Sequence, residues 1–111
     1  MLSRSSTWGV ASRRTKNAVY FVARIAIKDQ EKYDQYGQAA RATIPGNAKV
    51  LAVDFKAETV EGEWPGTHTV MLEFPDEAAF RAWYNSPAYQ EALKLRLAGT
   101  ESNSVLLHGM E

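Results

Sequence analysis

The segment 18–27 reads AVYFVARIAI, a run of β-branched and aromatic residues that predicts a β-strand. Side chains alternate between the two faces of a strand, and here both faces are largely apolar. Phe21 and Ile25 point to one face, and Tyr20 and Val22 point to the other. A strand of this kind needs cover on both faces, so the chain must place its sheet between two layers.

The rest of the sequence alternates helical and extended patterns. Asp29 is a suitable N-cap for a helix that Pro45-Gly46 would end. Ser86 and Pro87 are typical of a cap and a first helical position, so a second helix is expected to break and restart there. After the first strand we expect a helix over 30–44, a strand over 49–61, a strand over 68–74, a helix after Asp76 that is interrupted at 85–87 and continues to Gly99, and a last strand over 104–108.

This order, β-α-β-β-α-β, is that of the ferredoxin-like fold, an α+β class with one four-stranded antiparallel sheet and its helices on one face. Two helices cover only one face of such a sheet. The other face carries Tyr20, Val22 and Met71, and exposed apolar patches of that size are rare on monomers. A second copy of the same sheet is the most economical cover. We therefore expect a homodimer, a dimeric α/β barrel formed through this face.

Length and composition exclude several classes of protein. With 111 residues, 45% of them hydrophobic, the chain has room for a single folded domain. It has no cysteine and its two histidines lie far apart, so we expect no disulfide, no metal site and no cofactor. The formal net charge of zero gives no electrostatic reason to expect nucleic acid as a partner. No apolar run approaches the roughly 20 residues that span a bilayer, so no membrane association is expected.

The beginning of the chain differs from the rest, because it is basic and rich in serine. We expect a flexible basic tail over 1–16 and a folded domain over 17–111. A segment rich in Ser and Arg that lacks acidic residues also has the composition of an organellar transit peptide. The expected compartment is the cytoplasm, or an organelle if the tail is a transit peptide; translation from an upstream start codon is a further interpretation.

Several short motifs resemble one known family. They are Glu73-Phe74-Pro75, the pair Ala78-Ala79, the run Trp83-Tyr84-Asn85-Ser86-Pro87-Ala88-Tyr89 and, on either side, Glu61-Gly62-Glu63-Trp64 and Leu95-Arg96. Together they resemble the domain-of-unknown-function 1330 family, which belongs to the dimeric α/β-barrel group, over about residues 18–110. The resemblance implies a ferredoxin-like fold and a dimer. It implies no reaction, because the family has none assigned.

Aromatic side chains with polar groups are the first candidates for a binding site. Tyr36, Trp83 and Tyr84 come from the two predicted helices and are placed to line a cleft between helices and sheet. Arg96 borders the buried stripe of the last helix, where a guanidinium needs an anionic partner or ligand. The alternative is that the aromatic residues belong to the core and that Arg96 forms a structural salt bridge with Glu73.

Charged and titratable residues of the strands complete the candidate set. Arg24 and Glu73 lie in otherwise apolar strands, and we expect them to pair because the first and third strands are neighbours in this fold. His68 opens a strand and His108 ends one; each is a possible base or haem ligand, although a histidine at a strand end is commonly solvated. Haem-binding relatives in the barrel group use a helix histidine, and the predicted helices contain none, which disfavours haem. The candidate substrate-binding residues are Arg96, Tyr36, Trp83, Tyr84, Arg24, Glu73 and His68, and no catalytic residue is assigned.

Two kinds of function are compatible with these residues. In the first, the protein binds a small anionic or aromatic molecule between sheet and helices, and analogy with the barrel group adds isomerase or monooxygenase chemistry without a cofactor. In the second, the protein is a non-catalytic dimeric module whose aromatic residues are core. Polar aromatic residues beside an arginine favour the first. The absence of a recognisable base and nucleophile in the sequence favours the second.

Overall fold

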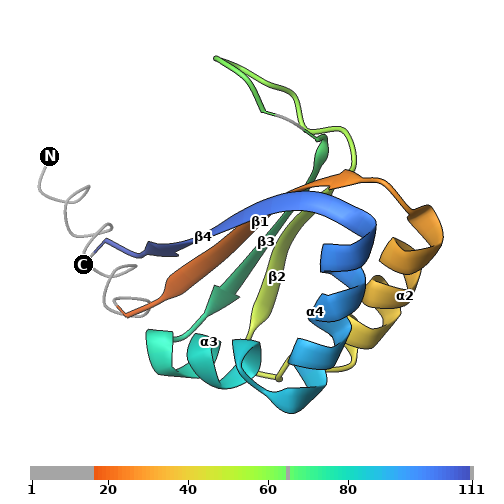
Figure 1. Ribbon diagram of the computed structural model, residues 1–111. Coiled ribbons are helices and arrows are strands. Elements are labelled where there is room, and N and C mark those ends of the chain that lie inside the picture. The colour runs from red at the N-terminus through yellow and green to blue at the C-terminus, as the bar shows by residue number, and fades with distance from the viewer. Residues whose placement is uncertain (1–16, 65, 111) are drawn as a thin grey trace, which may run out of the picture.

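The computed structural model describes residues 17–64 and 66–110 (Figure 1). The predicted tail over 1–16 lies outside the described residues, and its role stays a prediction. Within the described ranges the elements are, in chain order, β1 (Val19–Ile27), α2 (Gln30–Arg41), β2 (Lys49–Asp54), β3 (His68–Phe74), α3 (Glu77–Tyr84), α4 (Pro87–Gly99) and β4 (Thr100–His108).

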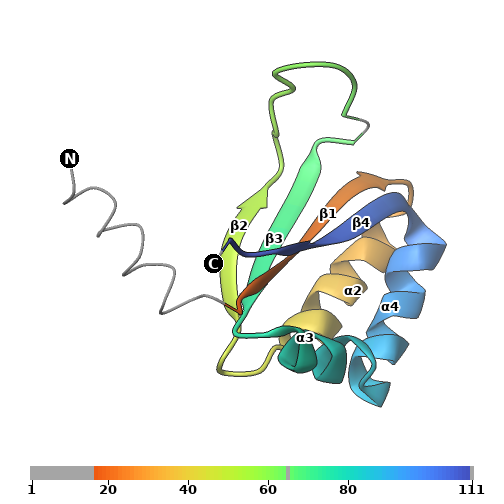
Figure 2. The ribbon, with the colours of Figure 1, turned by 90° about the vertical axis from the view of Figure 1, so that its left-hand side faces the viewer.

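The strands form one antiparallel sheet in the order β2-β3-β1-β4. The helices lie on one side of this sheet, as Figure 2 shows. Helices α3 and α4 are the two parts of the predicted second helix. They are separated where Ser86 Oγ accepts the Tyr89 N–H at 3.1 Å and Pro87 occupies the first turn of α4. The predicted ferredoxin-like α+β fold is confirmed.

Two strand boundaries differ from the sequence expectation. β2 ends at Asp54 and not at Glu61, because the Asp54 carboxylate accepts the Lys56 N–H at 2.8 Å in a turn that leaves the sheet. β4 begins at Thr100 and not at Ser104, because it follows α4 directly and pairs at once with the end of β1. The segment between β2 and β3 therefore projects beyond the sheet (Figures 1 and 2).

Aromatic rings dominate the core between the helices and the inner face of the sheet. Phe21 comes from β1, Phe74 from β3, Phe80 and Trp83 from α3, and Tyr89 from α4. Ring centroids lie 4.1 Å apart for Trp83 and Tyr89, 5.2 Å for Phe74 and Trp83, and 5.4 Å for Phe21 and Phe80. These contacts hold α3 and α4 over the two central strands of the sheet.

The outer face of the sheet is apolar and no described helix covers it. Val22 of β1 lies between Met71 of β3 and Val105 of β4, and Tyr20 lies beside Leu107. Val105 and Leu107 are 54% and 49% exposed. The face that the sequence indicated as a second apolar surface is therefore present on the folded chain.

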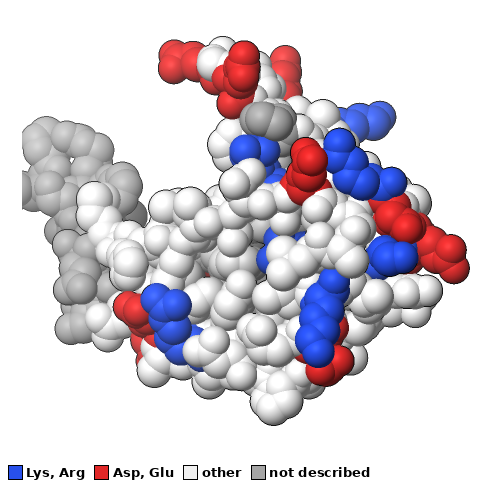
Figure 3. Space-filling model, viewed as in Figure 1, with Lys and Arg blue, Asp and Glu red and all other residues white. Residues whose placement is uncertain are grey.

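The projecting segment returns to the sheet at Gly66. It is acidic, and Figure 3 shows acidic side chains gathered over it; its acidic residues are Glu58, Glu61 and Glu63. Gly66 has φ +79°, and a Cβ there would lie 2.6 Å from the backbone oxygen of Ile25. Only glycine combines this backbone angle with so close an approach to β1. The approach sets the position of His68, which begins β3 two residues later.

We expect Gly66→Ala to destabilise the fold much more than Gly62→Ala. Gly62 also has a positive φ, +72°, but a Cβ there would have nothing within 4 Å. Gly62→Ala should therefore lower the free energy of unfolding by only about 1 kcal/mol, whereas Gly66→Ala adds a backbone clash and should cost about 2 kcal/mol more. Urea denaturation of both variants measures the difference. Equal losses would contradict close packing of Gly66 against β1.

Candidate functional site

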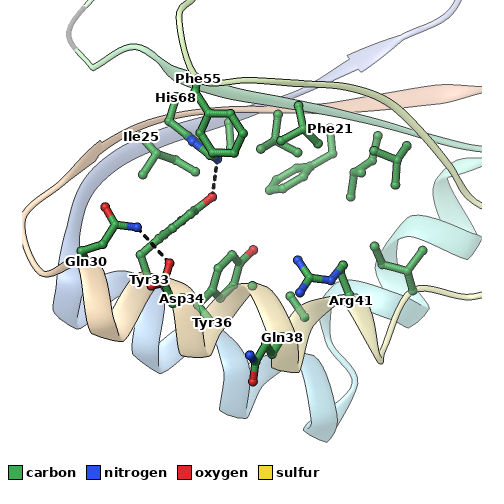
Figure 4. A pocket seen from close by; sticks show the side chains of 18 of the residues that line it. Phe21, Ile25, Gln30, Tyr33, Asp34, Tyr36, Gln38, Arg41, Phe55 and His68 are labelled. Carbon is green, nitrogen blue, oxygen red and sulfur yellow. Dashed lines mark hydrogen bonds between the residues drawn. The ribbon is translucent and has the colours of Figure 1, made fainter.

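A cavity of about 450 Å³ lies between α2 and the sheet. It exists because α2 does not cover the edge strand: all six residues of β2 are exposed. The inner side chains of β2 thus form one wall of the cavity. The inner face of α2 forms the other wall, and Figure 4 shows Tyr33, Tyr36 and Arg41 on it. Most of the floor is apolar and consists of Phe21, Ala23, Ile25, Val70 and Leu72, with Val50 and Val53 at the β2 wall.

A buried tyrosine–histidine pair stands at one end of the cavity. Tyr33 Oη and His68 Nε2 are 2.7 Å apart and share a hydrogen bond, drawn in Figure 4. The imidazole lies between two rings, with centroids 4.9 Å from Tyr33 and 4.4 Å from Phe55. His68 Nδ1 is buried and has no hydrogen-bond partner among the described residues. The pair is therefore a polar group in a largely apolar setting.

Burial keeps both members of this pair neutral. Burial lowers the pKa of His68 below its usual 6.5, against the smaller opposing effect of Asp54. Burial raises the pKa of Tyr33 to about 12, although the nearby Arg96 charge opposes that shift. At neutral pH the site thus presents a neutral imidazole and a protonated phenol.

The burial of His68 follows from its register in the sheet. His68 pairs with Ile25 of β1 and faces the helices together with Val70 and Leu72. The expectation of a solvated histidine considered only its place at the end of a strand. The two-residue period from His68 to Leu72 is the signal that places it on the inner face.

Arg41 stands toward the other end of the cavity and was not among the sequence candidates. It lies in the last turn of α2, and Figure 4 shows its guanidinium reaching toward the space between α2 and the sheet. Among the described residues no carboxylate lies within ion-pair distance of it. The spacing of Tyr33, Gly37 and Arg41 at i, i+4 and i+8 is the sequence signal that could have identified it.

The predicted aromatic residues have different surroundings. Tyr36 and Trp83 line the cavity. Tyr36 Oη is 2.9 Å from Tyr89 Oη, and Trp83 Nε1 donates to Thr43 Oγ1 at 2.9 Å. Tyr84 does not line the cavity; its ring packs on the core ring of Tyr89 at 5.4 Å. Two of the three aromatic candidates therefore meet at one site.

Arg96 lies behind Tyr36 and not in the cavity wall. It is only 3% exposed, its Nη1 donates to Ser102 Oγ at 3.0 Å, and its guanidinium carbon lies 5.6 Å from the centroid of the Tyr36 ring. Arg96 Nε has no hydrogen-bond partner among the described residues. The expected salt bridge with Glu73 is wrong, because Glu73 pairs with Tyr20 on the outer face of the sheet and Arg96 lies on the helix side.

Arg24 and Glu73 both lie on the outer face, away from the cavity. Arg24 is opposite Thr69 and Glu73 is opposite Tyr20, so four positions, on the order of 13 Å, separate them along the strands. The expected Arg24–Glu73 pair is therefore wrong. The Arg24 guanidinium instead lies 6.0 Å from the centroid of the Trp64 ring, a cation–π distance.

Metal and membrane features add nothing to this site. Over residues 17–64 and 66–110 no group of three or more His, Cys, Asp or Glu side chains is arranged to hold a metal ion. His108 lies at the surface, with Nε2 3.5 Å from Glu77 Oε1. No described helix is both long enough and apolar enough to cross a bilayer.

The lowered pKa of His68 predicts a pH-dependent stability. Below pH 6.5 the unfolded chain binds a proton at His68 that the folded chain resists, so the free energy of unfolding should fall as the pH falls through this range. The melting temperature should therefore decrease between about pH 7.5 and about pH 5.5, and His68→Gln should flatten the dependence. An unchanged slope in His68→Gln would contradict the argument.

The chain is similar to several proteins of known structure. RPA0582, a protein of unknown function from Rhodopseudomonas palustris, is 18% identical with a TM-score of 0.72, and the match covers 96% of this chain and 93% of that one. SnoaB, a cofactor-independent oxygenase from Streptomyces nogalater, is 17% identical with a TM-score of 0.60 and coverages of 86% and 95%. A dimeric ferredoxin-like protein of unknown function from Thermobifida fusca is 17% identical with a TM-score of 0.57 and coverages of 83% and 91%. At these identities the likeness shows a shared fold alone.

The family assignment comes from the sequence. No curated protein matches the chain. Residues 18–110 match the family described as Domain of unknown function (DUF1330). This range contains all of the described helices and strands, and it agrees with the range over which the sequence resembles this family. The chain belongs to the DUF1330 family.

Proposed function

We propose that the protein binds a small organic anion with an apolar, aromatic body in the cavity between α2 and the sheet. The observation that carries this proposal is an apolar cavity of about 450 Å³ with an arginine toward one end and a tyrosine–histidine pair at the other. Cavities of this size, with few polar groups in an apolar lining, are typical of small-molecule sites.

The charges around the cavity favour an anion. Arg41 points toward the cavity, and Arg96 lies buried behind the Tyr36 ring that lines it. Asp34 also lines the cavity, but its Oδ1 accepts a hydrogen bond from Gln30 Nε2 at 2.9 Å at the exposed rim. The electrostatic attraction exerted by a buried cation without a neighbouring carboxylate is weakly screened and extends over several ångströms. A ligand carboxylate would contact the Arg41 guanidinium, and Arg96 adds to the positive potential of the site.

Catalysis on such a ligand is a second candidate function. The hydrogen bond between Tyr33 and His68 favours it, because a neutral imidazole joined to a phenol is a group that can move a proton. SnoaB, which shares the fold, is a cofactor-independent oxygenase. Isomerase or monooxygenase chemistry without a cofactor would place this pair beside the reacting atoms.

Filling the cavity should abolish ligand binding. Gly37 lines the cavity, and a Cβ there would meet only Arg41 Nη1 at 3.5 Å, so Gly37→Leu can fold and extend its side chain into the space. Gln35 is exposed on the same helix and does not line the cavity, so Gln35→Leu is the matched control. With benzoate as the probe, calorimetry should show at least about tenfold weaker binding to Gly37→Leu and unchanged binding to Gln35→Leu.

The charge of the ligand is tested in the same titrations. Benzamide has the shape of benzoate without its charge, so the wild type should prefer benzoate. Arg41→Met should remove this preference, because it keeps much of the stem and deletes the cation. Equal binding of benzoate to the wild type and to Gly37→Leu, or an unchanged preference in Arg41→Met, would contradict the proposed site.

We further propose that a second copy of the chain covers the outer face of the sheet. The support is the apolar row of Val22, Met71 and Val105 on a face that no described helix reaches, together with a fold shared with a dimeric ferredoxin-like protein. A twofold arrangement would bring the same row of each copy against the other.

Val22→Asp should dissociate or unfold this dimer, because it buries an unpaired carboxylate at the centre of the interface. Light scattering at micromolar concentration should report about twice the chain mass for the wild type and the chain mass or aggregate for the variant. Leu97→Asp is the control, since Leu97 is 61% exposed on α4, away from the sheet face. A wild-type protein that stays monomeric would refute the proposed dimer.

A further inference from the structure

We infer that Tyr33, held by His68, donates a hydrogen bond into the cavity, and that the site selects an aromatic carboxylate that also carries a carbonyl acceptor on its ring. This inference rests on the proposed binding of aromatic anions and adds the substrate class. It depends on two features of the molecule: which nitrogen of His68 carries the proton, and the hydroxyl proton that this leaves to Tyr33.

The surroundings of His68 determine which of its nitrogens carries the proton. The neutral imidazole has one N–H, on Nδ1 or on Nε2. Nδ1 is buried without a hydrogen-bond partner among the described residues, whereas Nε2 lies 2.7 Å from Tyr33 Oη. A buried N–H without an acceptor is less tolerable than a buried lone pair without a donor. The proton therefore belongs on Nε2, which donates to Tyr33.

This assignment leaves the hydroxyl proton of Tyr33 for a ligand. Tyr33 Oη accepts from His68 Nε2, so its own O–H can point elsewhere. Tyr33 lines the cavity, and its high pKa keeps the phenol protonated at neutral pH. A ligand carbonyl oxygen satisfies this donor. His68 is then a positioning residue for this hydrogen bond, because it orients the phenol that donates to the ligand.

Tyr33 and Arg41 both line the cavity from α2. They lie eight residues apart, but the Arg41 side chain turns back along the helix, because its Nη1 lies 3.5 Å from the position of a Cβ at Gly37, one turn from Tyr33. The cation is therefore nearer to Tyr33 than the backbone spacing of the two residues indicates. We place the carboxylate of a single-ring ligand at Arg41 and its carbonyl group at Tyr33. The apolar floor of Phe21, Val70 and Leu72 then faces the ring.

Three benzoates of nearly equal size test the inference by calorimetry. 4-Formylbenzoate and 3-formylbenzoate carry an acceptor at two positions of the ring, and 4-methylbenzoate lacks an acceptor. The wild type should bind at least one of the two formyl isomers about fivefold more tightly than 4-methylbenzoate, as one neutral hydrogen bond provides. Tyr33→Phe should erase the gain and leave the affinity for 4-methylbenzoate unchanged.

His68 variants separate positioning from packing. His68→Gln keeps an N–H donor and should retain most of the fivefold gain, whereas His68→Leu keeps side-chain bulk and should lose it. In the protein without ligand, nitrogen NMR of the His68 ring should place the proton on Nε2. A proton on Nδ1 would overturn the inference, and so would an equal gain in Tyr33→Phe.

The outcomes distinguish this inference from the proposed function. If 4-methylbenzoate binds in an Arg41-dependent manner and neither formyl isomer brings a gain, the inference is wrong and the anion site stands. If the wild type binds none of the benzoates, the anion site is wrong, and the selection of a ring acceptor is wrong with it.

Discussion

The backbone junction at Gly99 determines where the helices lie. The Gly99 carbonyl, at the end of α4, accepts hydrogen bonds from the N–H groups of Lys28 and Asp29 at 2.8 and 2.9 Å. Lys28 and Asp29 directly precede α2, so these bonds join the end of α4 to the start of α2. A Cβ at Gly99 would lie 2.8 Å from Lys32 Cβ, so only a glycine lets α2 approach so closely. Because α2 is held against α4 beside β1 and β4, it does not extend over β2. The cavity between α2 and the sheet follows from this arrangement.

The polar groups of the cavity depend on the same placement. α2 presents Tyr33 near its start and Arg41 in its last turn, and both turn toward the side where the sheet is uncovered. β3 brings His68 to the same side through its register with β1. The core rings under α3 and α4, such as Phe74 and Trp83, fill the neighbouring space. The core rings therefore close the inner sheet face under α3 and α4, and the cavity remains between α2 and β2.

The local elements were predictable because short-range chemistry decides them. Ser86 and Pro87 mark the restart of the second helix in the sequence, and the structure begins α4 there. The alternation of apolar residues predicted the bounds of β1 and β3 to within one residue. The extents of β2 and β4 were not predictable from alternation, since β2 ends at a side-chain turn from Asp54 and β4 is lengthened by its pairing with β1.

The sequence by itself determined the order of elements, the family and the presence of apolar residues on both faces of the sheet, because these depend on residue type and period along one segment. Only the tertiary structure decided which polar residues meet. It joined Tyr33 to His68 across 35 positions, turned Arg41 toward the cavity, and put Arg96 and Glu73 on opposite sides of the sheet. Such pairings depend on strand register and on how helices pack, and neither is encoded within a single segment.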